Sequence, residues 1–133
     1  MKRSIVEQIR TDLQRKVVFI SGPRQVGKTT LAKMIHPSSY DYLNYDYADH
    51  RLIIKEKSWD RKKHVIILDE IHKMKNWKSW LKGIVDVESS PPHFLVTGSA
   101  RLEVARKVGD SMAGRFLSHR LHPFDLKELK QKF

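Results

Sequence analysis

Residues 17–30 read VVFISGPRQVGKTT, and they contain the clearest pattern of secondary structure in the sequence. Its first four residues are apolar and mostly β-branched, which is typical of a central strand covered on both faces. Residues 21–23 end that run, and residues suited to a helix begin at Lys28 and continue to about Ile35. The stretch therefore predicts a buried strand, a glycine-containing loop and a helix in direct succession.

The loop carries an uninterrupted G-x-x-x-x-G-K-T pattern over residues 22–29. Between a strand and a helix, this pattern is typical of a loop that surrounds a phosphate with backbone N–H groups. Glycine at the two fixed positions permits positive backbone torsions, and the helix that follows points its positive end at the same place. We therefore expect nucleotide phosphates to be bound by Gly22, Pro23, Arg24, Gln25, Val26, Gly27, Lys28, Thr29 and Thr30.

Individual residues of the loop have different expected roles. Lys28 can reach the β- and γ-phosphate oxygens as a point charge, and the Thr29 hydroxyl can be a ligand of Mg²⁺. Thr30 is expected to face the protein. Arg24 has three open alternatives: a phosphate contact, a contact with a neighbouring subunit, or an ordinary solvated position. For the motif as a whole, the alternative is a glycine turn that happens to precede a lysine.

Outside this stretch, apolar strand patterns and amphipathic helix patterns alternate. Strands are predicted at residues 40–47, 64–68, 94–97 and 116–121, and helices at residues 5–13, 48–57, 71–85, 101–108 and from 125 onward. This alternation predicts an α/β fold of three layers, with a five-stranded, mostly parallel sheet and helices on both faces. We expect residues 1–133 to form one domain that begins with an amphipathic helix within residues 1–16.

Two acids, Asp69 and Glu70, directly follow the apolar strand at residues 64–68. This position predicts that both carboxylates lie at the carboxyl edge of the sheet, beside the phosphate loop. Asp69 is suited to hold Mg²⁺ through its water shell, and Glu70 to orient or deprotonate an attacking water. The alternative is a pair of acids that only stabilises a helix N-terminus.

Ser99 is the first choice for a hydroxyl near the γ-phosphate, because it follows the strand that ends at Thr97. A serine at the end of such a strand is also a common N-cap of the following helix, and this alternative stays open.

Arg115 directly precedes the predicted fifth strand. A guanidinium there can neutralise charge on ATP held by an adjacent subunit, as an arginine finger does. Arg101 and Arg106 are rival candidates, and an ion pair within the same domain is the structural alternative.

The composition is strongly basic, with 26 Lys and Arg against 15 Asp and Glu and a formal net charge of +11. This net charge creates a positive electrostatic field that attracts polyanions, so DNA or RNA is a possible partner. A lysine-rich solvated surface without a partner has the same composition. Trp59, Trp77 and Trp80 lie among basic residues, where stacking on bases is conceivable. Core packing is the favoured interpretation for Trp77, which shares a helical face with neighbouring apolar residues.

Cysteine is absent, so neither a disulfide nor a thiolate metal site is expected. This fits a cytoplasmic protein. Charged residues interrupt the segment from Met1 to Asp12, so it does not form a secretory signal. The apolar runs of the sequence are much shorter than the ~20 residues of a membrane helix. The histidines show no ligand spacing, so no structural metal is expected.

The sequence resembles the AAA-superfamily ATPases of prokaryotes over nearly its whole length. The resemblance rests on residues 22–31 (GPRQVGKTTL), 68–73 (LDEIHK), 76–77 (NW), 97–100 (TGSA) and 113–115 (AGR), and more loosely on 42–44 and 123–124. It implies a P-loop NTPase core of the AAA/RecA-like type, with ATP and Mg²⁺ as cofactors. It also implies that the strand ending near Ser99 lies between the phosphate-loop strand and the acidic strand.

Family members usually continue into a C-terminal region, whereas this sequence stops at Phe133. The expectation is an ATPase core without a lid or accessory domain, and slow hydrolysis in isolation. The predicted function is a Mg-dependent ATPase that acts as a nucleotide-driven switch in a larger complex, and a homo-oligomer is one form that such a complex can take. Two alternatives stay open: a nucleotide-gated DNA-binding module with little turnover, and a P-loop kinase, which ranks last because no lid is evident.

Overall fold

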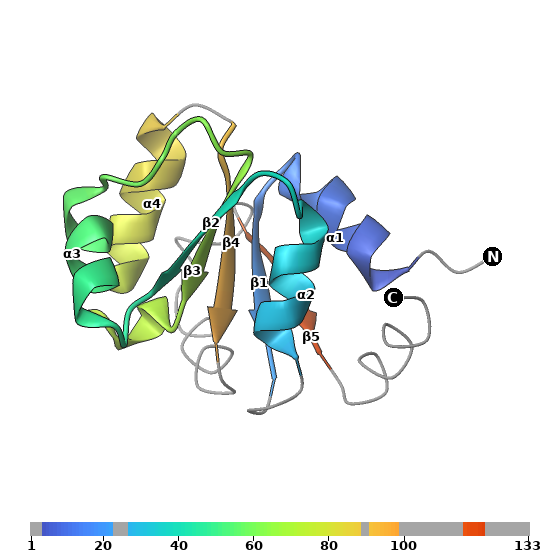
Figure 1. Ribbon diagram of the computed structural model, residues 1–133, viewed down its shortest axis with the longest axis horizontal. Helices are drawn as coiled ribbons and strands as arrows, with labels where there is room; N and C mark the ends of the chain where they lie inside the picture. The colour runs from blue at the N-terminus through green and yellow to red at the C-terminus, as the bar shows by residue number, and fades with distance from the viewer. Residues whose placement is uncertain (1–3, 23–26, 89–90, 99–115, 122–133) are drawn as a thin grey trace.

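The computed structural model describes residues 4–22, 27–88, 91–98 and 116–121, which form one sheet flanked by helices (Figure 1). The helices are α1 (Ile5–Leu13), α2 (Lys28–Ile35), α3 (Ala48–Glu56) and α4 (Trp77–Val87), with a 3₁₀ turn η1 (Ile71–Lys73) before α4. The strands are β1 (Val17–Ser21), β2 (Tyr40–Asn44), β3 (Val65–Asp69), β4 (His93–Gly98) and β5 (Phe116–Arg120). The helices predicted over residues 101–108 and from 125 onward lie outside the described ranges.

The sheet has the strand order β2-β3-β4-β1-β5, and every neighbouring pair is parallel. Strand β4 therefore lies between the phosphate-loop strand β1 and the acidic strand β3, as predicted. All strands consequently end at one edge of the sheet, the lower edge in Figure 1. In the register, Ser21 lies opposite Gly98 and Asp69 opposite Thr97.

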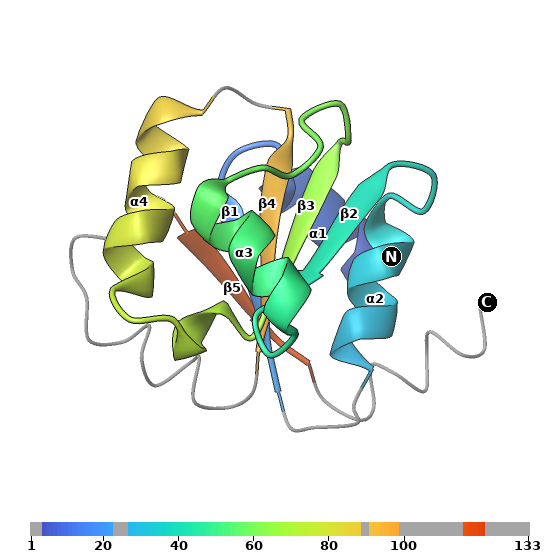
Figure 2. The ribbon, with the colours of Figure 1, turned by 60° about the vertical axis from the view of Figure 1, so that its left-hand side comes forward.

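Two layers of helices cover the sheet, α1 and α2 on one face and α3 and α4 on the other (Figure 2). Side chains of β1 alternate between them: Val18 and Ile20 pack with α1 and α2, whereas Val17 and Phe19 pack with α3 and α4. Every residue of β1 is buried. A strand buried on both faces has to be apolar at every position, which explains the uninterrupted apolar run and confirms the three-layer α/β fold.

Helix α1 forms as its amphipathic pattern predicts. The Ser4 side chain accepts a hydrogen bond from the Glu7 backbone N–H at 3.2 Å and caps the helix. Val6, Ile9 and Leu13 are buried on the sheet side.

Among the described residues, no helix combines the length and the apolar character needed to cross a lipid bilayer.

Strand β2 is shorter than the pattern predicts, because it ends at Asn44 and not at Tyr47. The Asn44 side-chain oxygen accepts a hydrogen bond from the Asp46 backbone N–H at 2.9 Å, and the Asn44 carbonyl accepts one from the Tyr47 N–H at 3.0 Å. An asparagine side chain that bonds the backbone two residues on stabilises a turn. This local bonding ends the strand, although the alternation of aromatic and polar residues continues.

The single helix predicted over residues 71–85 is divided into η1 and α4. Asn76 separates them with a positive φ of 62°, which asparagine tolerates better than most residues. The apolar face still forms, because Ile71, Trp77, Leu81 and Ile84 are all buried.

The tryptophans pack into the core. Trp77 is 7% exposed, as predicted, and Trp59 is 3% exposed. The ring of Trp59 contacts Trp80 and Phe94, with centroids 6.0 and 5.6 Å away. The indole rings of Trp59 and Trp77 therefore do not form an accessible stacking surface.

His93 should make stability sensitive to acid. Burial, followed by electrostatic interactions with His64 and His36, lowers the pKa of His93 below its ordinary value of 6.5. Between these two pKa values the unfolded chain binds more protons, so the free energy of unfolding decreases as pH falls below about 6.5 towards the lowered pKa. We expect the thermal unfolding midpoint to decrease between about pH 7 and pH 5. His93→Gln should flatten this dependence, and an unchanged slope in the variant would contradict the assignment.

Candidate functional site

The described part of the loop has the backbone that the glycine pattern requires. Gly27 is the N-cap of α2 and has a left-handed backbone, with φ 88° and ψ 24°. Gly22 has φ 156°, and a side chain would strain either position. Helix α2 begins directly after Gly27, so its first N–H groups are directed at the loop. Pro23, Arg24, Gln25 and Val26 lie outside the described residues.

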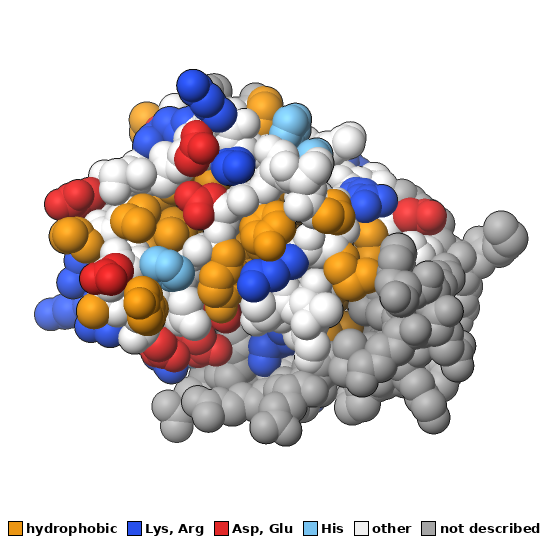
Figure 3. Space-filling view, in the orientation of Figure 1, with side chains coloured by type: hydrophobic (Ala, Val, Ile, Leu, Met, Phe, Trp, Pro, Cys, Tyr) orange, Lys and Arg blue, Asp and Glu red, His pale blue; other side chains and the backbone are white. Residues whose placement is uncertain are grey.

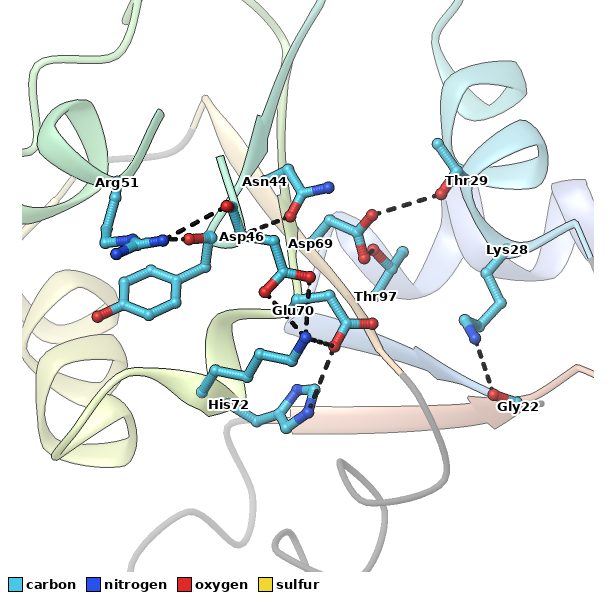
Figure 4. A network of polar contacts seen from close by, with 12 residues as sticks. Gly22, Lys28, Thr29, Asn44, Asp46, Arg51, Asp69, Glu70, His72 and Thr97 are labelled. Carbon is cyan, nitrogen blue, oxygen red and sulfur yellow. Dashed lines mark hydrogen bonds and ion pairs between the residues drawn. The ribbon is translucent and has the colours of Figure 1, made fainter. Parts of the chain in front are cut away.

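Lys28 is folded back over the start of this loop. Its Nζ donates a hydrogen bond to the Gly22 carbonyl oxygen at 2.8 Å (Figure 4). The side chain thus spans the loop between its two glycines. This position suits a cation that contacts phosphate bound within the loop.

Asp69 is the centre of the polar contacts at the carboxyl edge of the sheet. It is 8% exposed, and its Oδ1 accepts a hydrogen bond from the Thr97 hydroxyl at 2.8 Å. Its Oδ2 accepts hydrogen bonds from the Tyr42 hydroxyl and, at 3.5 Å, from the Thr29 hydroxyl. Strands β2, β3 and β4 and the first turn of α2 therefore meet at one carboxylate, and Figure 4 shows its contacts with Thr29 and Thr97.

The predicted metal ligands, Thr29 and Asp69, are thereby brought side by side. A hydroxyl and a carboxylate are oxygen donors of the kind Mg²⁺ prefers, and Mg²⁺ keeps several waters and needs few protein ligands. The residues present fit such an ion.

Tyr42 is a site residue that the sequence analysis misses. Burial, followed by the hydrogen bond to Asp69 and the charge of that carboxylate, raises the pKa of Tyr42, so its hydroxyl stays a donor. The Asn44 side chain donates a further hydrogen bond to the Tyr42 oxygen at 3.3 Å, and Lys33 lies over the ring, 4.6 Å from its centroid. The alternating pattern of β2 places Tyr42 on a strand, but only the pairing of β2 with β3 brings it to Asp69.

Glu70 follows β3 in a left-handed conformation, with φ 60° and ψ 28°. Its backbone N–H donates to the Thr97 carbonyl at 2.9 Å, which holds the residue against β4. Its Oε2 lies 3.5 Å from both His72 Nε2 and Lys73 Nζ. Left-handed backbone in a non-glycine residue is uncommon and concentrates at functional sites.

His72 is a neutral partner of Glu70. Burial lowers the pKa of His72, although the charge of Glu70 opposes this shift. Its ring therefore contacts the Glu70 carboxylate as an uncharged imidazole near neutral pH.

Other predicted site residues have different outcomes. Thr30 is exposed and does not face the protein, because Leu31, Ala32 and Ile35 occupy the buried side of α2. This expectation was wrong. Ser99, Arg115 and the rival arginines Arg101 and Arg106 lie outside the described part of the chain, and their roles stay predictions.

Thr97→Val tests the support of Asp69. Thr97 is fully buried, and valine keeps its shape but removes the hydroxyl that bonds Oδ1 of the carboxylate. We expect the free energy of unfolding, measured by urea denaturation, to decrease by about 1.5–3 kcal/mol, because hydrogen bonds to charged groups contribute about this much. The control Ser79→Ala, at an exposed position of α4, should change it by less than about 0.5 kcal/mol. Equal stability of Thr97→Val and the parent would contradict this role.

Comparisons with known sequences find a matching family and two curated relatives. The chain matches a protein family described as an AAA domain over residues 14–130. Two curated relatives, uncharacterized proteins of Mycobacterium bovis and Mycobacterium tuberculosis, are each 31% identical to it over 123 residues. The match covers 86% of this chain and 27% of each relative, so most of each relative extends beyond the matched part.

Solved structures with a similar arrangement of elements are more distant in sequence. A DNA polymerase III gamma subunit-related protein of Thermotoga maritima aligns with a TM-score of 0.50 and 9% identity, over 96% of this chain and 49% of that protein. The Pif1 protein of Bacteroides, bound to single-stranded DNA, aligns with a TM-score of 0.48 and 12% identity, over 87% of this chain and 40% of its own. At 9% identity, the Thermotoga maritima structure shows a shared fold and nothing more.

Proposed function

The chain belongs to the AAA domain family, and on this premise we propose that it binds Mg-ATP at the carboxyl edge of its sheet and hydrolyses the γ-phosphate. Membership of the family and the P-loop fold support nucleotide binding and hydrolysis in general. The choice of ATP, the need for Mg²⁺ and the residue roles below are proposals.

One contact carries the proposal: the Thr29 hydroxyl and the Asp69 carboxylate, 40 residues apart in the chain, lie 3.5 Å from each other. The contact places the helix that follows the phosphate loop against the end of the acidic strand. A triphosphate held by the loop would therefore face the two carboxylates of Asp69 and Glu70. Thr29 and Asp69 together would hold a Mg²⁺ ion beside the bound phosphates.

Each residue has a distinct proposed role in binding. Backbone N–H groups from residues 22–29 surround the phosphates, and Lys28 neutralises the charge on the β- and γ-phosphates. Thr29 and Asp69 would hold Mg²⁺, directly and through its waters respectively, and the bound ion would neutralise the charge that develops on the phosphate oxygens. Thr97 and Tyr42 keep the Asp69 carboxylate fixed through their hydroxyl groups.

Glu70 is the proposed base for hydrolysis. Glu70 directly follows Asp69, and the hydrogen bond from its backbone N–H to the Thr97 carbonyl holds its backbone against β4, which supports this role. A carboxylate at this position can accept the proton of a water that attacks the γ-phosphate. Ser99 and Arg115 complete the proposal, as a hydroxyl near the γ-phosphate and as a finger towards a neighbouring subunit.

The biological setting belongs to the proposal as well. We place the chain in the cytoplasm, as a nucleotide-driven switch within a larger complex. The match covers 27% of the length of each curated relative. Any activity of a whole protein of that length is therefore a proposal as well.

A DNA-binding module gated by nucleotide is the second candidate, favoured by the net charge of +11. On the face shown in Figure 3, Lys and Arg side chains are interspersed with acidic ones and do not form a single patch. If DNA is the partner, its affinity should decrease steeply with salt, because each phosphate neutralised releases counterions.

Calorimetry and phosphate release test the proposed function. The parent chain should bind ATP and ADP in the presence of Mg²⁺ and release phosphate from ATP slowly, and parallel titrations with GTP measure base selectivity. Absence of ATP binding would contradict the site. Binding without any phosphate release, with or without DNA, would favour the second candidate over hydrolysis.

A further inference from the structure

Lys73 lies between two carboxylates from different parts of the fold. Its Nζ is 2.8 Å from both carboxylate oxygens of Asp46, and 3.5 Å from Oε2 of Glu70 (Figure 4). Asp46 belongs to the turn between β2 and α3, and Lys73 ends η1. Lys73 therefore connects Glu70, the proposed base, with the β2–α3 turn. This turn lies outside the phosphate loop.

The turn that carries Asp46 is itself fixed. The Asn44 side chain accepts a hydrogen bond from the Asp46 N–H at 2.9 Å. Arg51, from α3, donates to the Tyr45 carbonyl at 2.9 Å and to the Asp46 carbonyl at 3.4 Å. Asp46 is therefore an anchor, and Lys73 holds to it with two short contacts.

Glu70 offers the same oxygen to two nitrogen atoms. Both His72 Nε2 and Lys73 Nζ lie 3.5 Å from Oε2. The hydrogen bond to Asp46 raises the pKa of Lys73 above its ordinary value of 10.5, which already keeps the side chain positively charged at neutral pH. A carboxylate oxygen engaged with donors has less capacity to accept a bond from water.

We propose that Lys73 is a positioning residue that holds the Glu70 carboxylate in a resting orientation, and that Asp46 limits this hold by drawing Lys73 towards the β2–α3 turn. The inference rests on the proposed hydrolysis and assigns a regulatory contact to the same site. A partner that binds the exposed Asp46 carboxylate would compete for Lys73 and so change how strongly Lys73 engages Glu70. Hydrolysis would then respond to a partner that touches this turn, without a change in the phosphate loop.

The exposure of the pair makes it suitable for mutation. The Lys73 and Asp46 side chains are 40% and 50% exposed. Exposed ion pairs contribute little to stability, so variants at either position should fold like the parent.

The test compares two substitutions with opposite expected effects. Lys73→Met removes the contact and should raise the kcat of phosphate release about threefold, which corresponds to the coupling typical of an exposed ion pair. Asp46→Asn leaves Glu70 as the carboxylate nearest to Lys73 and should lower kcat by a similar factor. Lys73→Arg keeps the charge and should stay near the parent. In each variant the Kd for ATP should be unchanged.

Lys75→Met is the matched control, because Lys75 is exposed and has no ion pair within the part of the chain that the structure describes. Its kcat should equal that of the parent. If Lys73→Met and Asp46→Asn change kcat in the same direction or not at all, while the parent hydrolyses ATP, this inference alone is overturned. If the parent and Lys73→Met both bind ATP and neither releases phosphate, the proposed hydrolysis fails, and this inference fails with it.

Discussion

Lys28→Ala should weaken the binding of Mg-ATP by about 30- to 100-fold, measured by calorimetric titration. Loss of a charge-assisted hydrogen bond costs about 2–3 kcal/mol, and each 1.4 kcal/mol corresponds to a factor of ten in Kd. The Lys28 ammonium group already lies over the loop, bonded to the Gly22 carbonyl, so ATP would find it near the phosphate position. Without this cation, the phosphates would lose a positive charge that the backbone dipoles of the loop do not replace.

Lys62→Ala is the matched control for this change. Lys62 is an exposed lysine in the segment between α3 and β3, remote in sequence from the loop. Its removal lowers the net charge equally, so both variants lose the same long-range attraction for ATP. Only Lys28→Ala should lose the local contact. If both variants bind ATP as tightly as the parent, the phosphate site has been assigned to the wrong residues.

Glu70→Gln should lower the rate of phosphate release by about 10²- to 10⁴-fold and leave ATP affinity near that of the parent. Glutamine has nearly the same shape but cannot accept a proton from water near neutral pH. The backbone bond from residue 70 to Thr97 does not involve the side chain, so the end of β3 should keep its conformation. Single-turnover phosphate release and calorimetry on the same preparation provide the two measurements.

Glu56→Gln, an equivalent exchange at the exposed end of α3, should leave turnover unchanged. Turnover in Glu70→Gln within a few-fold of the parent would show that another group, or bulk water, accepts the proton. The two variants together separate binding from chemistry, because Lys28→Ala should lose both and Glu70→Gln only the second.

Much of the fold could be predicted from local patterns. A strand buried on both faces has to be apolar at every position, so β1 and β3 stand out in the sequence. The strand order was predictable only through the family resemblance, because no local pattern specifies which strands pair. The ends of elements were less predictable: Asn44 ends β2, and Asn76 separates η1 from α4, each through its own backbone or side-chain geometry.

The residues of the candidate site were likewise predictable from the sequence only in part. Gly27 and Lys28 could be identified as site residues from the sequence. A left-handed glycine followed by a helix depends only on consecutive residues. Tyr42 could not, because an aromatic residue on a half-exposed strand has no special pattern, and its partner Asp69 is reached only when β2 pairs with β3.

The order of elements, the apolar faces and the positive φ angles of Gly22 and Gly27 follow from local sequence, because they depend on the chemistry of residues within a few positions of one another. The contacts of the site depend instead on the folded sheet: Thr29 meets Asp69, Tyr42 and Thr97 support this carboxylate, and Lys73 connects Glu70 to Asp46. These contacts join residues of different strands and turns. Their distances follow from strand order and register, which arise from the packing of the whole sheet and not from any single segment.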